Sequence, residues 1–171
     1  MNLKDIKRLY TYNPEEGIFR YKYSRGKCRI HQEAGTSYST YKYRKIQVGQ
    51  LIIDAHRLAI WWVEGEYPTT EDWPHIDHLD GDGDNNKYLN LKKCKSNSEN
   101  SKNSKMYTTN TSGVTGVSWQ RNTHKWFAYI WDKGKRINLG YYEDLEEATT
   151  VRIAAEKRLG YTDRHGSKET K

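Results

Sequence analysis

Asp77 and His78, which are adjacent in the chain, are the residues best suited to chemistry. Asn90 and Asn100 follow beyond an acidic run at 80–84. A carboxylate can hold a divalent metal ion, and a neighbouring imidazole can take a proton from water. Metal-assisted cleavage of a phosphodiester needs these two functions at one point. The segment therefore predicts a site that hydrolyses nucleic acid.

The charges of the chain are segregated along the sequence, although the net charge is only +7. Residues 1–55 hold 11 Lys and Arg against 5 Asp and Glu, and residues 87–136 hold 11 against 2. Between these two segments, residues 56–86 hold one basic residue against eight Asp and Glu. Basic segments attract a phosphate backbone, whereas the acidic segment repels DNA unless a cation is held there. This distribution favours a nucleic-acid-binding protein over a generic solvated surface, which intersperses the two signs.

The composition of the 171 residues allows one domain or two small ones. Fourteen Tyr and six Trp can fill small cores, because each aromatic side chain buries a large area. The two cysteines, Cys28 and Cys94, are too few for a four-cysteine zinc site. We expect no secretory signal at the N-terminus, and the sequence shows no apolar run of membrane-spanning length. We expect a soluble protein of the reducing cytoplasm, that of the host cell if a phage encodes it.

The first half of the chain predicts short hairpins that carry basic side chains. Apolar residues at helical spacing predict one or two helical turns in 1–12, and apolar and basic residues alternate as a strand in 18–23. Residues 41–48 and 51–55 predict a hairpin, followed by a helix at 56–66. We expect the following basic residues to grip the DNA backbone: Arg20, Lys22, Lys42, Arg44 and Lys45.

Residues 75–94 predict a strand, a long loop and a second strand. A short polar helix at 96–104 and a linker at 105–112 follow. The aspartate-rich part of the loop differs from a calcium-binding loop, because its sixth position is Asn85 instead of Gly and its twelfth is Leu91 instead of Glu. The loop is better explained as a tight turn, since Asp, Asn and Gly are turn formers.

This segment contains four characteristic runs: Asp77-His78-Leu79-Asp80-Gly81-Asp82, Asp84-Asn85-Asn86, Asn90-Leu91-Lys92 and Ser98-Glu99-Asn100. Together they resemble the HNH endonuclease motif, in the variety found in phage and intron-encoded homing endonucleases. The resemblance covers about residues 10–104. It implies a core of two strands and a helix around a metal ion, with double-stranded DNA as the substrate.

The resemblance also implies a role for each polar residue of the motif. Asp77 would be a metal ligand, and His78 would be the general base that activates water for in-line attack on phosphorus. Asn90 would hold the His78 ring through its side-chain oxygen. Asn100 would supply the second metal ligand, and the metal would be magnesium or manganese.

The second metal ligand is less well defined than the first, because the spacing departs from the usual pattern. Asn100 lies ten positions after Asn90, whereas nine is usual in the family. Glu99 and Asn97 therefore remain alternatives for this ligand.

The C-terminal part predicts a small sheet packed on a helix. Residues 114–120, 126–131 and 136–140 are expected to form three strands, and a helix follows from the Asp144 cap to Gly160. The central strand would place Trp126, Ala128 and Ile130 against the helix. Its other face would expose aromatic side chains, an arrangement suited to docking in a groove. An alternative is that these aromatics pack against the N-terminal domain. The last residues, from Asp163, are expected to fray.

This part contains Asn110-Thr111-Ser112-Gly113-Val114-Thr115-Gly116-Val117-Ser118-Trp119, Lys125-Trp126, Leu139-Gly140-Tyr141-Tyr142 and Glu146-Glu147-Ala148. These runs resemble the plant Apetala-type DNA-binding domain, similar versions of which accompany HNH nucleases in phage proteins. The resemblance implies that the sheet enters the major groove with the helix behind it. The expected DNA contacts, including two from the preceding segment, are Lys92, Lys93, Ser118, Gln120, Arg121, Phe127, Tyr129, Trp131, Arg136 and Asn138.

Together these observations predict an α+β protein in which residues 1–104 form an HNH endonuclease domain with basic N-terminal β-hairpins. Residues 105–112 would form a linker, and residues 113–171 a three-stranded antiparallel sheet on one helix. The predicted activity is site-specific cleavage of DNA by a homing endonuclease. One site per chain predicts nicking by a monomer, and cutting of both strands by a homodimer or by sequential action. A catalytically inactive DNA-binding regulator and an RNA-binding protein remain alternatives.

Overall fold

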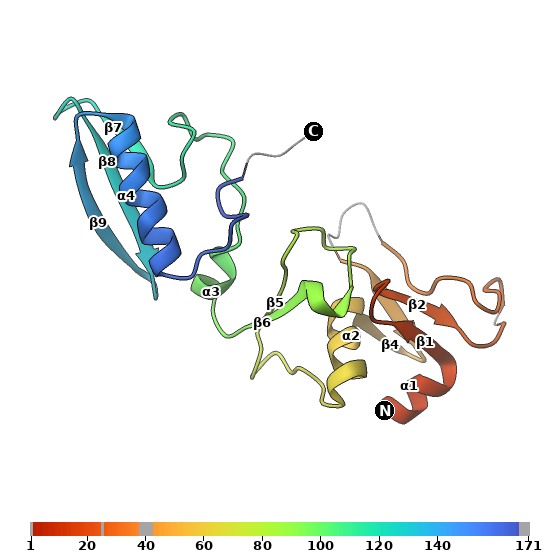
Figure 1. The fold of residues 1–171 in the computed structure, drawn as a ribbon. Coiled ribbons are helices and arrows are strands. Elements are labelled where there is room, and N and C mark those ends of the chain that lie inside the picture. Colours follow the sequence, from red (N-terminus) through yellow and green to blue (C-terminus); the bar gives the residue numbers. More distant parts are fainter. Residues whose placement is uncertain (1, 25, 38–42, 168–171) are drawn as a thin grey trace. The chain divides into compact units, whose positions relative to one another are not determined.

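The chain folds into two compact units, Met1–Lys95 and Ser96–Lys171, in a computed structural model (Figure 1). The structure describes residues 2–24, 26–37 and 43–167. Both units combine helices with small antiparallel sheets, so the predicted α+β class is confirmed at this level. Lys42, one of the basic residues expected to contact DNA, lies outside the described residues.

Among its described residues, unit 1 contains three two-stranded antiparallel sheets and two α-helices. In chain order its elements are α1 (Leu3–Leu9), β1 (Tyr10–Asn13), β2 (Ile18–Tyr21), β3 (Lys45–Val48), β4 (Leu51–Asp54), α2 (Ala55–Glu64), β5 (His75–His78), the 3-10 turn η1 (Tyr88–Asn90) and β6 (Leu91–Cys94). The pairs are β1–β2, β3–β4 and β5–β6. The predicted hairpin before α2 and the strand, loop and strand of 75–94 are confirmed.

The helical turns predicted within 1–12 are confirmed as α1, which ends at Leu9, but the strand that follows it was not predicted. Tyr10 begins β1 and lies opposite Tyr21 of β2. Tyr10 and Tyr12 are buried, while Thr11 and Asn13 are exposed. This alternation has the period of a strand and buries both tyrosine rings in the core of unit 1.

The core of unit 1 connects the hairpins to α2. Phe19 stacks on Tyr12 at a ring-centroid distance of 4.4 Å, and the Trp62 ring of α2 meets Phe19 edge-on at 5.8 Å. Ile46 and Leu58 are fully buried in the same cluster. These contacts make β1–β2, β3–β4 and α2 one scaffold.

Arg57 of α2 holds the loop that leads into β5. Its guanidinium is buried and donates to the carbonyl oxygens of Pro68, Trp73 and Pro74, at 2.6, 3.2 and 3.1 Å. A planar guanidinium with several donors suits this task, because it satisfies backbone acceptors that burial would otherwise leave without partners. The start of β5 at His75 is thereby fixed relative to α2.

Unit 2 contains a three-stranded antiparallel sheet packed on a helix, as predicted. Its elements are α3 (Asn97–Ser101), β7 (Val117–Gln120), β8 (Lys125–Asp132), β9 (Lys135–Tyr142) and α4 (Leu145–Arg158), with strand order β7-β8-β9. Ala128 of β8 is fully buried and packs in one core cluster with Val117 and Ala148. The small side chain of Ala148 lets α4 approach the sheet closely.

The segment from Ser96 to residue 112 belongs to unit 2. The backbone carbonyl of Lys102 accepts from Thr162 N at 3.2 Å, and that of Ser104 accepts from Gly166 N at 3.0 Å. The Lys102 ammonium donates to Leu159 O at 2.7 Å. The units therefore divide between Lys95 and Ser96, earlier than the predicted domain end at 104. The expected fraying also does not begin at Asp163, because residues up to 167 pair with this segment.

Candidate functional site

His78 is the last residue of β5 and lies on its buried face. Its side chain is 3% exposed, and Nε2 lies 3.4 Å from Oδ1 of Asn86. Burial lowers the pKa of His78 below its ordinary value, although the amide of Asn86 and the carboxylates of Asp80 and Asp77 act in the opposite direction. A neutral imidazole at neutral pH can accept a proton, as a general base must.

Two further rings enclose His78. The ring of Tyr43 stacks on it at 5.6 Å, and the ring of His56 from α2 meets it edge-on at 5.4 Å. Tyr43 and His56 also meet edge-on, at 4.8 Å. His56 is 5% exposed, and its Nδ1 is buried without a hydrogen-bond partner. The three rings limit the orientations open to His78, and their meeting could not be predicted because they come from three separate segments.

The burial of His56 predicts a loss of stability in acid. Burial, reinforced by His78, lowers the pKa of His56 to about 4 from an ordinary 6.5. The folded state then resists protonation, so its stabilisation is complete above pH 6.5 and declines as the pH falls towards 4. The free energy of unfolding would be measured in urea at pH 7 and at pH 5. Between these two pH values we expect it to fall by about 2 kcal/mol more in the wild type than in His56→Phe, because phenylalanine cannot titrate. Equal losses in the two proteins would contradict this assignment.

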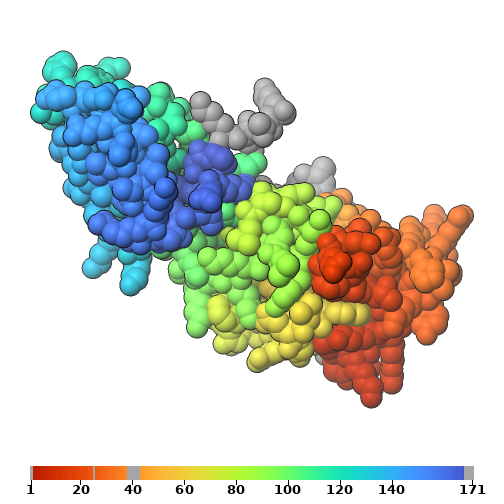
Figure 2. Space-filling view, viewed as in Figure 1, coloured from red at the N-terminus to blue at the C-terminus, as the bar shows by residue number. Residues whose placement is uncertain are grey.

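Asn86 is held in place by a residue distant in the sequence. The hydroxyl of Tyr12 donates to Asn86 O at 2.7 Å, and both residues are buried. Gly17 allows the close approach of the β1–β2 turn to this loop: its φ is +75°, and a β-carbon there would collide with the backbone of Asn86 and Lys87. In Figure 2 the yellow-green loop surface lies directly against the red N-terminal hairpin.

Asn90 braces the acidic loop, which differs from its predicted role. Its Oδ1 accepts from the backbone N of Asp80 at 3.0 Å. Its Nδ2 donates to Oδ1 of Asp80 and to the carbonyl of Asn85, both at 2.9 Å. The amide oxygen beside the His78 ring belongs to Asn86. The fold of the loop brings Asp80 and Asn85 within reach of the Asn90 amide, and a role of Asn90 towards the His78 ring stays a prediction.

The bracing role predicts that both groups of the Asn90 amide are needed. Asn90→Asp keeps an acceptor but loses the donor and places a carboxylate beside Asp80, so we expect its cleavage rate to fall about 100-fold through a displaced loop. If Asn90 only held an imidazole through its oxygen, the aspartate variant would keep most of its activity. Single-turnover cleavage by Asn90→Asp and Asn90→Ala separates the two cases. If Asn90 braces the loop, both variants should cleave slowly.

Asp80 remains ionised within this braced loop. Burial alone would raise its pKa, but hydrogen bonds from the backbone of Asp82 and from the amides of Asn90 and Asn85 hold the pKa below its ordinary value. Asp84 is likewise ionised, because the guanidinium of Arg44 lowers its pKa. The loop therefore places negative charge near His78.

Asp77 lies on β5 opposite Lys92 of β6. Its carboxylate is half-buried and close enough to His78 to affect the pKa of the imidazole. The other predicted ligand, Asn100, lies on α3 in unit 2. Their pairing around one metal ion stays a prediction, as does the choice among Asn100, Glu99 and Asn97.

The donors available at this site suit a hard cation. Among the described residues, no group of three or more His, Cys, Asp or Glu side chains is arranged to hold a metal ion. Magnesium, however, binds through one or two carboxylates and completes its shell with water and substrate phosphate oxygens. Asp77 with an amide oxygen fits that mode of binding, and it does not fit a zinc site.

Several basic residues expected to grip DNA already have acidic partners. Arg44 lies 2.7 Å from Glu33 and 2.8 Å from Asp84, with which it forms a bidentate pair. This arrangement ties the acidic loop to the segment before β3, so Arg44 has a structural role instead of a free positive charge. The pairing of Arg44 with Asp84 could not be predicted from local sequence, because the two residues are 40 positions apart.

The other residues of unit 1 that were predicted to contact the DNA backbone differ in their partners and exposure. Lys45 pairs with Asp54 at 2.8 Å, and Lys93 pairs with Glu64 at 2.6 Å. Arg20 forms an exposed pair with Glu16 at 3.2 Å, and Lys22 donates to the carbonyl of Lys7 at 2.7 Å. Exposed ion pairs contribute little and exchange readily for a phosphate. Of these ion pairs, that of Arg20 is the most exposed, and contact of Arg20 with DNA stays a prediction.

The outer face of the unit 2 sheet carries a cluster of aromatic rings under an arginine. The ring centroid of Phe127 lies 5.8 Å from that of Tyr129 and 4.8 Å from that of Tyr141. Tyr141 was not among the residues predicted for this face. The guanidinium of Arg136 lies over the rings of Phe127 and Tyr129, at 5.9 and 5.6 Å. Trp131 is 50% exposed beside them. Ala128 and Ile130 are fully buried on the opposite face, as the alternation predicted. Phe127 was expected to be exposed, but it is buried beneath its neighbours Tyr129, Tyr141 and Arg136.

The polar residues expected to read DNA lie on the same sheet and its turns. Gln120 donates to the hydroxyl of Ser118 at 3.0 Å, and both are half-buried on β7. Arg121 and Asn138 are exposed. Contact of these residues with DNA stays a prediction.

No helix among the described residues is both long and apolar enough to span a membrane. Comparison with known proteins found no match among protein-family models, curated proteins or solved structures.

Proposed function

We propose that this protein is a metal-dependent HNH endonuclease that cleaves DNA at specific sites, in the manner of a homing enzyme. The observation that carries this proposal is the environment of His78. A buried imidazole with a lowered pKa stands at the end of a β-hairpin, next to Asp77 and before a braced acidic loop. This is the arrangement that a general base near a bound cation requires.

In this mechanism His78 accepts the proton of the attacking water. Asn86 and the rings of Tyr43 and His56 orient its imidazole, so that the ring does not need to reorganise during the reaction. Asp77 and Asn100 would hold magnesium or manganese. That ion would offset the negative charge that develops on the phosphate oxygens and on the leaving 3′-oxygen.

The proposed DNA-binding surface is the outer face of the β7-β8-β9 sheet, used as in an Apetala-type domain. Tyr129 and Arg136 form a preassembled aromatic and cationic surface there, over the buried ring of Phe127. Side chains held by mutual stacking lose little conformational entropy on binding. One His78 per chain supports nicking of one strand by a monomer, and a homodimer on DNA would cut both.

The cleavage pattern on genomic DNA tests this proposal. The protein should release discrete fragments in the presence of magnesium or manganese and none with EDTA. A smear of fragments would indicate a nuclease without site specificity. Competition between duplex DNA and RNA in the same buffer separates the RNA-binding alternative, in which RNA would displace the duplex.

One observation favours a second function, that of a DNA-binding regulator without nuclease activity. Asn100 lies ten positions after Asn90 instead of the usual nine, and Glu99 precedes it, so the second metal ligand departs from the motif. In that case the protein would shift duplex DNA in a gel and would leave it intact with every divalent metal tested.

A further inference from the structure

Buried polar atoms without partners are concentrated around one cavity of unit 2. Among the described residues, four have buried side-chain nitrogen or oxygen atoms that make no hydrogen bond. One is His56, and the other three, Thr115, Arg152 and His165, all line the same cavity of about 400 Å³. His165 contacts the backbone of Ser101 and the guanidinium of Arg152, so Thr115 and Arg152 are the two groups in need of a partner. Buried polar groups without partners are uncommon and indicate a bound polar molecule.

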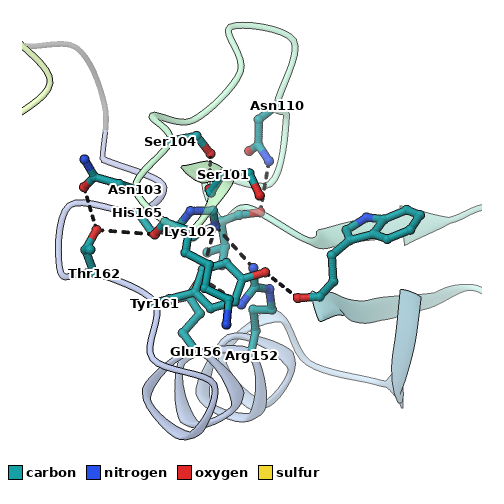
Figure 3. Close-up of polar contacts among 12 residues, drawn as sticks. Ser101, Lys102, Asn103, Ser104, Asn110, Arg152, Glu156, Tyr161, Thr162 and His165 are labelled. Carbon is teal, nitrogen blue, oxygen red and sulfur yellow. Dashed lines mark hydrogen bonds and ion pairs between the residues drawn. The ribbon is translucent and has the colours of Figure 1, made fainter. Parts of the chain in front are cut away.

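The cavity lies at the edge of β8 that β7 does not cover. The last backbone bond on that side joins Tyr129 N to Gly116 O at 2.8 Å, and Ile130 and Trp131 beyond it line the cavity. Tyr161 closes one end by donating to the carbonyl of Trp131 at 2.6 Å. Figure 3 shows Arg152 of α4 beside Tyr161, with Ser101 and Ser104 on the facing segment.

Arg152 supplies the only formal charge in the cavity wall among the described residues. It is 2% exposed, and its Nε has no partner. The wall contains no Asp or Glu. Glu156 contacts NH1 of Arg152 at 2.8 Å but lines a different hollow, so it compensates the charge from the other side. His165 is neutral at pH 7, because burial, reinforced by Arg152, lowers its pKa to about 4.

The close packing around Arg152 shows that the chain accommodates it at a cost. Gly116 has a φ of +77°, and a β-carbon there would lie 2.5 Å from Nε of Arg152. Only glycine leaves room for the guanidinium at this point. Burying an arginine whose Nε makes no hydrogen bond is unfavourable unless a ligand completes its bonds.

We propose that this cavity binds a nucleotide, with its phosphate on Nε of Arg152 and the hydroxyl of Thr115. Phosphate oxygens are acceptors that match these donors and the positive charge. The cavity volume falls within the range of small-molecule sites, about 300–1,000 Å³, and exceeds the needs of a phosphate alone. Tyr107 and Trp131, which are 78% and 50% exposed, stand at the wall where a base can stack.

The nucleotide can come from a DNA strand that passes the sheet edge or from solution. The proposal does not depend on the nuclease reaction, because the cavity lies wholly within unit 2. It can therefore be tested in EDTA, where cleavage does not occur, and its failure would leave the proposed nuclease activity untouched.

The test is a titration of the full-length protein with deoxyadenosine monophosphate, deoxyadenosine and inorganic phosphate, followed by the backbone NMR signals of residues 115, 116, 152 and 165. We expect saturable shifts with the nucleotide, and binding about tenfold weaker for the nucleoside and for phosphate alone. Thr115→Val, which removes the hydroxyl at nearly constant volume, should weaken nucleotide binding about tenfold. Thr150→Val is the matched control: its hydroxyl on α4 bonds to Glu146 O outside the cavity, so binding should be unchanged.

The outcomes distinguish a nucleotide of the DNA from a free nucleotide, and two of them would overturn the proposal. Shifts that disappear when duplex DNA is bound first assign the cavity to a nucleotide of the DNA. Shifts that persist on the complex assign it to a free nucleotide. Absence of saturable shifts would mean that the cavity holds no nucleotide. Equal binding by Thr115→Val and wild type would mean that the nucleotide binds without the Thr115 hydroxyl, and either result would overturn the proposal.

Discussion

Replacing His78 by alanine should reduce DNA cleavage by about 100-fold to 10,000-fold, the range expected for loss of a general base. DNA affinity should change little, because His78 is buried at the end of β5 and contributes no charge at neutral pH. The rate is measured in single-turnover cleavage and the affinity by gel shift, with the same DNA and the same metal. A loss of rate without loss of binding assigns the imidazole to the chemical step.

The control for this experiment lies on the same strand. His75 begins β5 and is only half-buried, so His75→Ala should cleave at nearly the wild-type rate. His78→Ala also leaves a cavity between Tyr43 and His56, which can destabilise unit 1 by about 2–4 kcal/mol. Urea unfolding must therefore show that the variant is folded under the assay conditions. Undiminished cleavage by a folded His78→Ala protein would exclude His78 as the base.

Removing the exposed aromatic and cationic groups of the sheet together should weaken DNA binding about 10-fold to 100-fold. In the double variant Trp131→Ala/Arg136→Ala, one stacking surface and one positive charge are lost. Loss of a phosphate-binding cation should also reduce the dependence of log affinity on log salt by about one unit. Fluorescence anisotropy with a labelled duplex at several salt concentrations measures both effects.

A charge-matched control distinguishes the sheet face from the net charge of the protein. Lys157 lies in the last turn of α4 and is exposed. Lys157→Ala removes one positive charge, as the double variant does, and should weaken binding much less. Equal effects of the two variants would mean that the protein binds DNA through its overall charge and that the sheet face has no special role.

Alternation and capping in the sequence were sufficient to predict most strands and α4. In β8 the buried Ala128 and Ile130 alternate with the more exposed Tyr129 and Trp131, as a two-residue period requires, while Phe127 is covered by other outer-face side chains. Tyr10–Asn13 was missed because apolar residues at helical spacing continue from α1 into β1. Two patterns overlapped there, and pairing with β2 decided between them.

The sequence indicated which residue types form the candidate site but not how their polar groups pair. Asn85, Asn86 and Asn90 are equivalent in type, and only the folded loop shows that Asn86 faces His78 while Asn90 braces Asp80. The pairing of Arg44 with Asp84 was likewise hidden, because it joins segments 40 positions apart. Such contacts depend on tertiary structure, for which local spacing carries no signal.

The extent of unit 2 could not be predicted for a related reason. The polar stretch around Lys102 and Ser104 has the composition of a linker, yet its carbonyl groups accept from the backbone of Thr162 and Gly166. Backbone hydrogen bonds of this kind leave no trace in side-chain composition. The cavity with Arg152 follows from the same pairing, because this segment forms one of its walls.

The most direct test of the proposed function is to follow the oxygen of the attacking water. Supercoiled DNA would be incubated with the wild type in heavy-oxygen water, with magnesium, with manganese and with EDTA. The proposed mechanism predicts strand breaks only with a divalent metal, and the heavy oxygen in the newly formed 5′-phosphate, because water attacks phosphorus and the 3′-oxygen leaves. Intact DNA under every metal condition, with binding retained in a gel shift, would contradict the nuclease assignment.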